Sequence, residues 1–174
     1  MLGRLRDASI VILATAGLWS FWSQYSALSA LSWWYDNTQN VRARTATRTP
    51  DYDLATLPWK ATNPRVFEVK PGIMTLATSG DPFGYQVFAD ISTGGAAAVD
   101  ILFDGQIEAG GVTIGLLQGG KWIAIKSIPA PGAFADANSA QLGYQRSLTV
   151  MIANDNPAGE SRLTIKSLQL FLRN

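Results

Sequence analysis

The N-terminal part of the chain contains a long stretch without a single charged side chain. It runs from Ser9 to Tyr35 and is rich in Leu, Ile, Ala, Trp and Ser. As a helix that rises about 1.5 Å per residue, a stretch of this length exceeds the roughly 30 Å hydrocarbon core of a bilayer. We therefore predict an N-terminal tail and a single uncleaved transmembrane helix within residues 1–35.

The flanks of this stretch resemble membrane boundaries, because basic residues precede it and aromatic residues, which favour the lipid–water interface, close it. The predicted interface residues are Arg4, Arg6, Trp33, Trp34 and Tyr35. Two alternatives remain open. One is a signal peptide cleaved within the small residues at 27–30, and the other is an amphipathic helix that lies flat on the membrane.

Small and polar residues inside the stretch suggest more than anchorage. Serines recur at every third position from 20 to 32, and a glutamine stands near the middle. Small residues let membrane helices approach closely, and an amide in lipid needs a hydrogen-bond partner. We predict that the helix packs on other membrane helices through Ser20, Ser23, Gln24 and Ala27. The alternative is that each serine bonds back to its own helix.

The side chains that most enzymes use are missing from the whole chain. Neither histidine nor cysteine occurs in its 174 residues, which excludes a histidine-dependent triad, thiolate chemistry and metal sites built on these ligands. A net charge of +1 gives no field that would attract nucleic acid. The carboxylates of Asp104 and Glu108 could share one strand face, as a glycosidase pair would. Turn and solvent roles explain them more simply, so we predict no catalytic residue, metal site or cofactor.

Residues 36–64 show no helical or alternating pattern and contain threonine-rich and proline-punctuated stretches. Such a segment is typical of an extended linker. Its contacts would be with the chain's own β domain, or with a partner surface or lipid phosphates. The residues that we expect to make them are Arg42, Arg44, Arg48 and Trp59.

From residue 65 onward the chain has the pattern of an all-β domain. Short runs of alternating apolar and polar residues are separated by Gly, Pro, Asn and Asp, which indicates strands and turns. We predict a turn at Asp104-Gly105, a loop over 129–140, and a bulge at Lys166-Ser167, where the alternation changes phase. Eight or so strands without a helical pattern predict a mainly β, two-sheet sandwich over residues 65–174.

Several motifs of this region resemble the jelly-roll modules of the galactose-binding-like class, to which carbohydrate-binding modules belong. A strand with Gly115-Leu116 precedes Trp122, and an Asn-, Gly- and Ser-containing loop at 154–161 leads into the closing strand. The resemblance implies a jelly-roll fold and, for members that bind sugar, exposed aromatic side chains. Many members also hold a structural calcium ion through an acidic residue in the closing strand, where this chain has Lys166-Ser167.

Three aromatic residues are candidates for contacts with a ligand or partner. Phe83 lies in a predicted turn and Phe134 in the predicted 129–140 loop, so we expect both to be exposed. Trp122 lies in a predicted strand, and for it we favour the alternative of burial between the sheets.

These observations lead us to predict a non-catalytic, membrane-anchored accessory subunit. It would act as a scaffold that stabilises a larger membrane complex, such as an energy-transducing or photosynthetic assembly, with the β domain on the extracytoplasmic (periplasmic) side. Its partners would be other integral membrane subunits and the lipid bilayer. The alternative is a membrane-tethered module that binds carbohydrate or the cell envelope.

Overall fold

The computed structural model describes residues 37–174. The predicted membrane segment lies outside these residues, as do its candidate contacts Arg4, Arg6, Ser20, Ser23, Gln24, Ala27, Trp33, Trp34 and Tyr35. Within the described part of the chain, no helix has both the length and the apolar character that a bilayer crossing requires.

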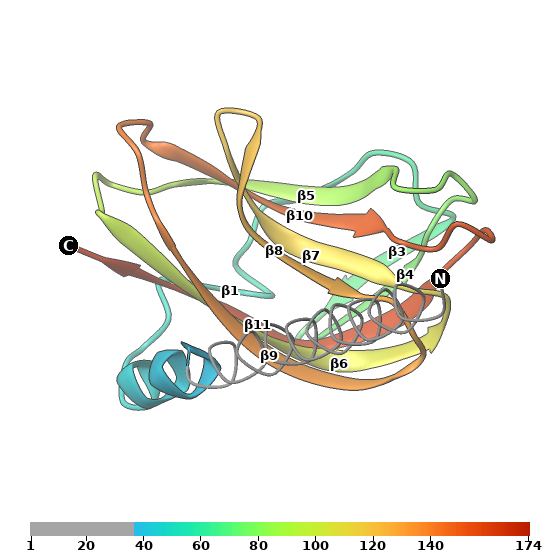
Figure 1. The fold of residues 1–174 in the computed structure, drawn as a ribbon, viewed down its shortest axis with the longest axis horizontal. Coiled ribbons are helices and arrows are strands. Elements are labelled where there is room, and N and C mark those ends of the chain that lie inside the picture. The colour runs from blue at the N-terminus through green and yellow to red at the C-terminus, as the bar shows by residue number, and fades with distance from the viewer. Residues whose placement is uncertain (1–36) are drawn as a thin grey trace, which may run out of the picture. The chain divides into compact units, whose positions relative to one another are not determined.

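Residues 37–174 form two antiparallel sheets that pack face to face (Figure 1). The larger sheet has the order β3 (Val66–Lys70), β4 (Ile73–Ala77), β11 (Arg162–Arg173), β6 (Ala98–Ala109) and β9 (Gly132–Gln141), and β1 (Tyr52–Asp53) also pairs with β11. The smaller sheet has the order β2 (Trp59–Ala61), β5 (Tyr85–Ser92), β10 (Ser147–Asn154), β7 (Val112–Gln118) and β8 (Lys121–Ile128). This architecture confirms the predicted mainly β, two-sheet sandwich.

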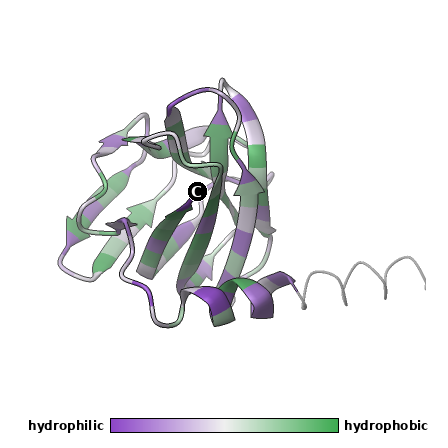
Figure 2. Cartoon of the chain, turned by 90° about the vertical axis from the view of Figure 1, so that its left-hand side faces the viewer, coloured by the Kyte–Doolittle hydropathy of each residue, from purple (hydrophilic) through white to green (hydrophobic). Residues whose placement is uncertain are grey.

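The core forms because alternate residues of each strand turn toward the facing sheet. In β10 these residues are Leu148, Val150 and Ile152, all at most 1% exposed. The colouring of Figure 2 shows the same alternation of apolar and polar residues along the strands. In β11 the buried set changes phase after Ile165, and the pairing with β6 shifts register between Ile165 and Ser167. The predicted bulge is therefore confirmed.

Two local predictions are wrong. The predicted 129–140 loop contains β9, which pairs with β6 along its full length. Its small residues have too little apolar contrast to give a strand pattern. The predicted turn at Asp104-Gly105 lies inside the continuous strand β6. Gly105 marks a close approach instead, because a Cβ there would overlap the carbonyl oxygen of Thr164 and lie 2.8 Å from Cζ of Phe134.

The segment that we expected to be a linker lies against the sandwich. Residues 37–45 are helical, and Val41 is completely buried. After this helix the chain forms β1 on the larger sheet, places Leu54 and Leu57 in the core, and forms β2 on the smaller sheet. We call residues 38–61 the strap. The sequence left open whether this segment contacts the chain's own β domain or a partner surface or lipid. In the described residues it contacts the β domain.

A partly buried ion pair holds the helix of the strap on the outer face of the larger sheet. Asp100 of β6 is completely buried, and Arg44 donates to both its carboxylate oxygens, at 2.7 and 2.6 Å. Nε of Arg173 lies 3.1 Å from the same carboxylate. Burial alone would raise the pKa of Asp100. Hydrogen bonds from Arg44 and Ser139, with the charges of Arg44 and Arg173, outweigh burial and hold this pKa below its ordinary value.

The other predicted contacts of this segment also fall on the sandwich. Arg48 donates to the carbonyl oxygen of Leu172 at 2.8 Å, and its guanidinium lies 5.6 Å from the centre of the Phe171 ring. Trp59 packs against the core and donates from Nε1 to the carbonyl oxygen of Leu54 at 3.0 Å. Arg42 is exposed, and its side chain makes no ion pair within residues 37–174.

Candidate functional site

Three aromatic side chains, Tyr85, Phe88 and Trp122, lie on the outer face of the smaller sheet. Residues that face each other in an antiparallel pair project their side chains on the same side of the sheet. The register of β5, β10, β7 and β8 therefore sets three rows on this face. They are Asp90, Thr149, Leu117 and Trp122; Phe88, Met151, Gly115 and Ile125; and Tyr85, Ala153, Thr113 and Ser127.

Two of these aromatic rings contact each other. The rings of Tyr85 and Trp122 meet edge to face, with centroids 6.0 Å apart and planes at 81°. Trp122 is half-buried and lies over Gly115, where a Cβ would come within 2.8 Å of its Cζ3 atom. Tyr85 is 44% exposed, and the neighbouring Ile125 is 53% exposed. The glycine thus leaves room for the indole ring, and the pair presents an apolar surface to solvent.

Polar side chains border this apolar surface on both sides. Ser127 donates a hydrogen bond to the carboxylate of Asp155, beside the Tyr85 row. On the far side, Thr149 donates to Asp90 at 2.7 Å, and Lys60 of β2 lies 3.6 Å from the same carboxylate. The ammonium group of Lys60 also sits 5.5 Å from the centre of the Phe88 ring. Phe88 is therefore covered by the protein's own cation, while the Tyr85–Trp122 pair is open.

The three aromatic candidates from the sequence have different environments. Trp122 lies on the outer face of the smaller sheet. The favoured prediction, burial between the two sheets, is therefore wrong. Phe83 is 65% exposed and has a φ of 60°, which is unusual for a bulky residue. The prediction that Phe134 is exposed in a loop is wrong, because it lies in β9 and packs against the core, with its ring centroid 6.2 Å from that of Phe103.

The carboxylates Asp104 and Glu108 lie on the larger sheet, away from the aromatic surface. Glu108 accepts a hydrogen bond from Thr164 at 3.2 Å, and Asp104 is half-buried in the middle of β6. Within residues 37–174, no group of three or more carboxylates is arranged to hold a metal ion.

The loop that carried the family resemblance has a structural role. The side-chain amide of Asn154 donates to the carbonyl oxygens of Ser79, Asp81 and Gly159, at 3.3, 3.1 and 2.8 Å. Ser161 is completely buried, and its hydroxyl oxygen accepts from the backbone N–H of Gly111 at 2.9 Å. These bonds join the ends of strands from both sheets.

Sequence reasoning missed the position of Tyr85. Its alternation placed it in phase with the buried residues Val87, Ala89 and Ile91. The pairing of β5 with β10 shifts register between Ile152 and Ala153, and this irregularity brings Tyr85 to the outer face. The sequence carries no signal for this shift; the structure shows it as the burial of two consecutive residues, Gln86 and Val87, which strict alternation does not allow.

Comparisons with known proteins identify the fold. No protein-family model and no curated protein sequence matches the chain. A solved structure described as "CBM4 structure and function" matches with a TM-score of 0.53 and 8% identity, over 72% of this chain and 97% of that one. At this identity the match shows the fold alone, a sandwich of the carbohydrate-binding-module type.

Two further solved structures have lower TM-scores. The carbohydrate-binding module TmCBM61, in complex with beta-1,4-galactotriose, matches with a TM-score of 0.46 and 11% identity, over 67% of this chain and 89% of that one. The carbohydrate-binding module CBM36, in complex with calcium and xylotriose, matches with a TM-score of 0.44 and 11% identity, over 69% of this chain and 98% of that one.

The match to the CBM4 structure contradicts the prediction of a scaffold subunit in a membrane complex. The fold that it shows is the one expected for our alternative, a membrane-tethered module that binds carbohydrate or the cell envelope. The structure also gives the expected linker a role within the domain. Its residues 38–61 pack on the chain's own sandwich, where Arg44 bonds to Asp100 and Arg48 to Leu172.

Proposed function

We propose that this chain is a non-catalytic carbohydrate-binding module that binds a glycan on the outer face of the smaller sheet. The single observation that carries the proposal is the open Tyr85–Trp122 pair on that face. The expected tether of the module, a membrane helix within residues 1–35 with the sandwich on the extracytoplasmic side, rests on the sequence alone and is part of the proposal.

The chemistry of the surface suits a sugar ring. One face of a pyranose carries mainly C–H groups, which stack on aromatic side chains, while its hydroxyl groups need hydrogen-bond partners. The aromatic pair offers the apolar contact. Asp155 and Asp90, on the two sides of the pair, offer carboxylate acceptors. The likeness of the sandwich to a CBM4 module supports this reading of the surface.

Binding of the full chain to neutral polysaccharides tests the proposal. We would measure retention on cellulose, xylan, mannan and galactan in mild detergent, and affinities for the matching hexasaccharides by calorimetry. Trp122→Ala should weaken binding of the preferred glycan at least about tenfold, because it removes the stacking surface.

Val66→Ala is the control, since Val66 is an exposed apolar residue on β3 of the larger sheet, outside both the aromatic pair and its borders. It should bind the neutral glycan like the wild type. A chain that binds none of the four glycans, or a Trp122→Ala variant that binds as tightly as the wild type, would contradict the proposal.

A further inference from the structure

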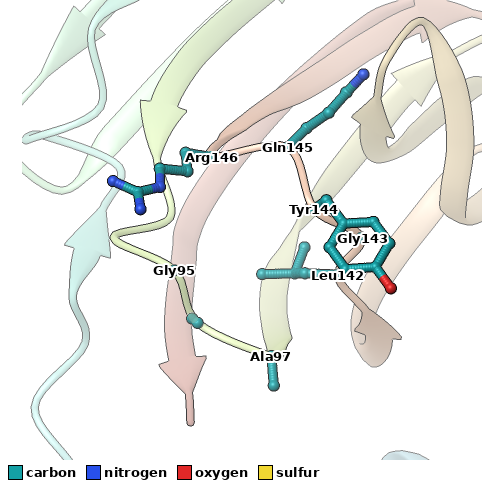
Figure 3. Close-up of a pocket in the computed structure, with 8 residues that line it drawn as sticks. Gly95, Ala97, Leu142, Gly143, Tyr144, Gln145 and Arg146 are labelled. Carbon is teal, nitrogen blue, oxygen red and sulfur yellow. The ribbon is translucent and has the colours of Figure 1, made fainter.

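A hollow at one end of the sandwich lies apart from the aromatic pair. It has a volume of about 510 Å³ and lies between the β5–β6 loop, at residues 95–97, and the β9–β10 loop, at residues 142–146 (Figure 3). This volume falls within the range of ligand sites in proteins, roughly 300–1,000 Å³. The backbone and small side chains of Gly95, Ala96 and Ala97 line one side of it.

Hydrogen bonds fix both loops around the hollow. Gln118, at the end of β7, accepts from the backbone N–H of Gly143 and donates to the carbonyl oxygen of Gln145, both at 2.7 Å. The two loops are also joined directly. The N–H of Leu142 donates to the carbonyl oxygen of Ala97, and the N–H of Thr93 donates to that of Arg146, both at 2.8 Å. A ligand would therefore meet a preformed surface and would not have to order these loops.

Two side chains beside the hollow have no other evident use. The Tyr144 ring is fully exposed. Arg146 is exposed too, and its guanidinium makes no ion pair within residues 37–174. Figure 3 shows these side chains leaving the same loop on different sides of the hollow. An aromatic face can stack on a sugar ring, and a guanidinium binds a carboxylate or sulfate group through paired hydrogen bonds.

We propose that this hollow is a second binding site, which takes an acidic oligosaccharide. Tyr144 stacks on a sugar ring, and Arg146 binds the carboxylate or sulfate group of a neighbouring ring. The inference rests on the proposed function in one respect, because a glycan is the expected ligand only if the domain is a carbohydrate-binding module. The second site differs from the site on the sheet face in two ways: its ligand is anionic, and it lies between two loops.

The test measures binding of tetragalacturonic acid, its methyl ester and a sulfated carrageenan tetrasaccharide to the full chain by calorimetry. The wild type should bind at least one acidic oligosaccharide, and a preference between them tells carboxylate from sulfate. Arg146→Gln and Tyr144→Ala should each weaken this binding at least about tenfold. Added salt should weaken wild-type binding but have little effect on Arg146→Gln.

Arg42→Gln is the matched control, because it removes the same charge from an exposed arginine of the strap. It should bind the acidic oligosaccharide like the wild type. Three results would overturn the inference. The first is equal binding by Arg146→Gln and Arg42→Gln, and the second is no binding of either acidic probe. The third is equal affinity for tetragalacturonic acid and its methyl ester together with no binding of the sulfated probe.

The Trp122→Ala variant separates this inference from the proposed function. If neutral glycans bind in a Trp122-dependent manner and acidic ones do not bind through Arg146, only the second site fails. If no neutral glycan binds but Arg146-dependent binding of an acidic one is measured, the sheet-face site fails and the second site stands.

Discussion

At the scale of single residues, Ser161 shows how one hydroxyl group can join the two sheets. Its oxygen lies 2.6 Å from the carbonyl oxygen of Gly111 and 2.8 Å from Oδ1 of Asn154, and it accepts from the N–H of Gly111. The backbone N–H of Ser161 in turn donates to the hydroxyl of Thr78 at 2.7 Å. All these groups are buried, so water cannot replace a lost partner.

Ser161→Ala should lower the free energy of unfolding by about 1–3 kcal/mol, because it leaves the buried N–H of Gly111 without an acceptor. Urea denaturation of the variant and the wild type measures this difference. Ser147→Ala serves as the control, since Ser147 is exposed at the start of β10. Equal losses in the two variants would show that the buried hydroxyl has no special role.

The residues of the candidate site were only partly predictable from the sequence. Trp122 could be named as an aromatic candidate, but its face depended on the β8 register, which shifts between Leu116 and Leu117. Tyr85 lies on the outer face because the pairing of β5 with β10 also shifts register, between Ile152 and Ala153. A one-residue irregularity reverses the side of every residue beyond it, and alternation alone cannot locate such a shift. Phe83 was correctly placed in a turn because Asp81-Pro82 and Gly84 are turn residues.

At the scale of elements, the strap helix depends on a carboxylate that lies 56 residues further along the chain. No periodic pattern in residues 36–64 could reveal this pairing, because the partner stands on another strand. The strands of the sandwich were predictable where large apolar residues alternate, as in β10. β9 was not, because Gly and Ala give alternation little apolar contrast. Local pattern therefore predicted the sheets but not what covers them.

Asp100→Asn should destabilise the fold by about 1.5–3 kcal/mol at neutral pH, because it removes a completely buried carboxylate that accepts two hydrogen bonds from the charged Arg44 and lies 3.1 Å from Nε of Arg173. Since the pKa of Asp100 is lowered by folding, its contribution is complete above the unfolded pKa of about 3.9 and is lost as pH falls through the folded value. The difference between variant and wild type should therefore shrink below about pH 4.

Denaturation at a series of pH values measures this effect, with Asp104→Asn as the control. Asp104 lies on the same face of β6 but makes no ion pair within residues 37–174. A difference between Asp100→Asn and wild type that stayed constant down to pH 2 would show that the carboxylate charge does not stabilise the strap.

At the scale of the whole described domain, the strap helix and the proposed glycan surface lie on different sheets. Arg44 and Asp100 hold the strap helix on the outer face of the larger sheet, while Tyr85 and Trp122 lie on the outer face of the smaller one. The proposed glycan surface therefore lies on the side of the sandwich opposite to the strap helix.

The strap also decides where the folding unit begins. The sequence pattern changes at residue 65, but Val41, Leu54 and Leu57 are at most 4% exposed. The burial of each of these side chains adds about 1.5–3 kcal/mol to the stability of the fold. In a chain without Arg44, Asp100 also loses its bidentate partner. Small domains are stable by only about 5–15 kcal/mol, so these losses are large enough to unfold the sandwich.

We expect a chain of residues 38–174 to unfold cooperatively in urea and to keep Trp122-dependent glycan binding. A chain of residues 65–174 should not fold, and its NMR spectra should lack dispersed amide signals. A folded 65–174 chain with the same urea midpoint would place the strap outside the folding unit.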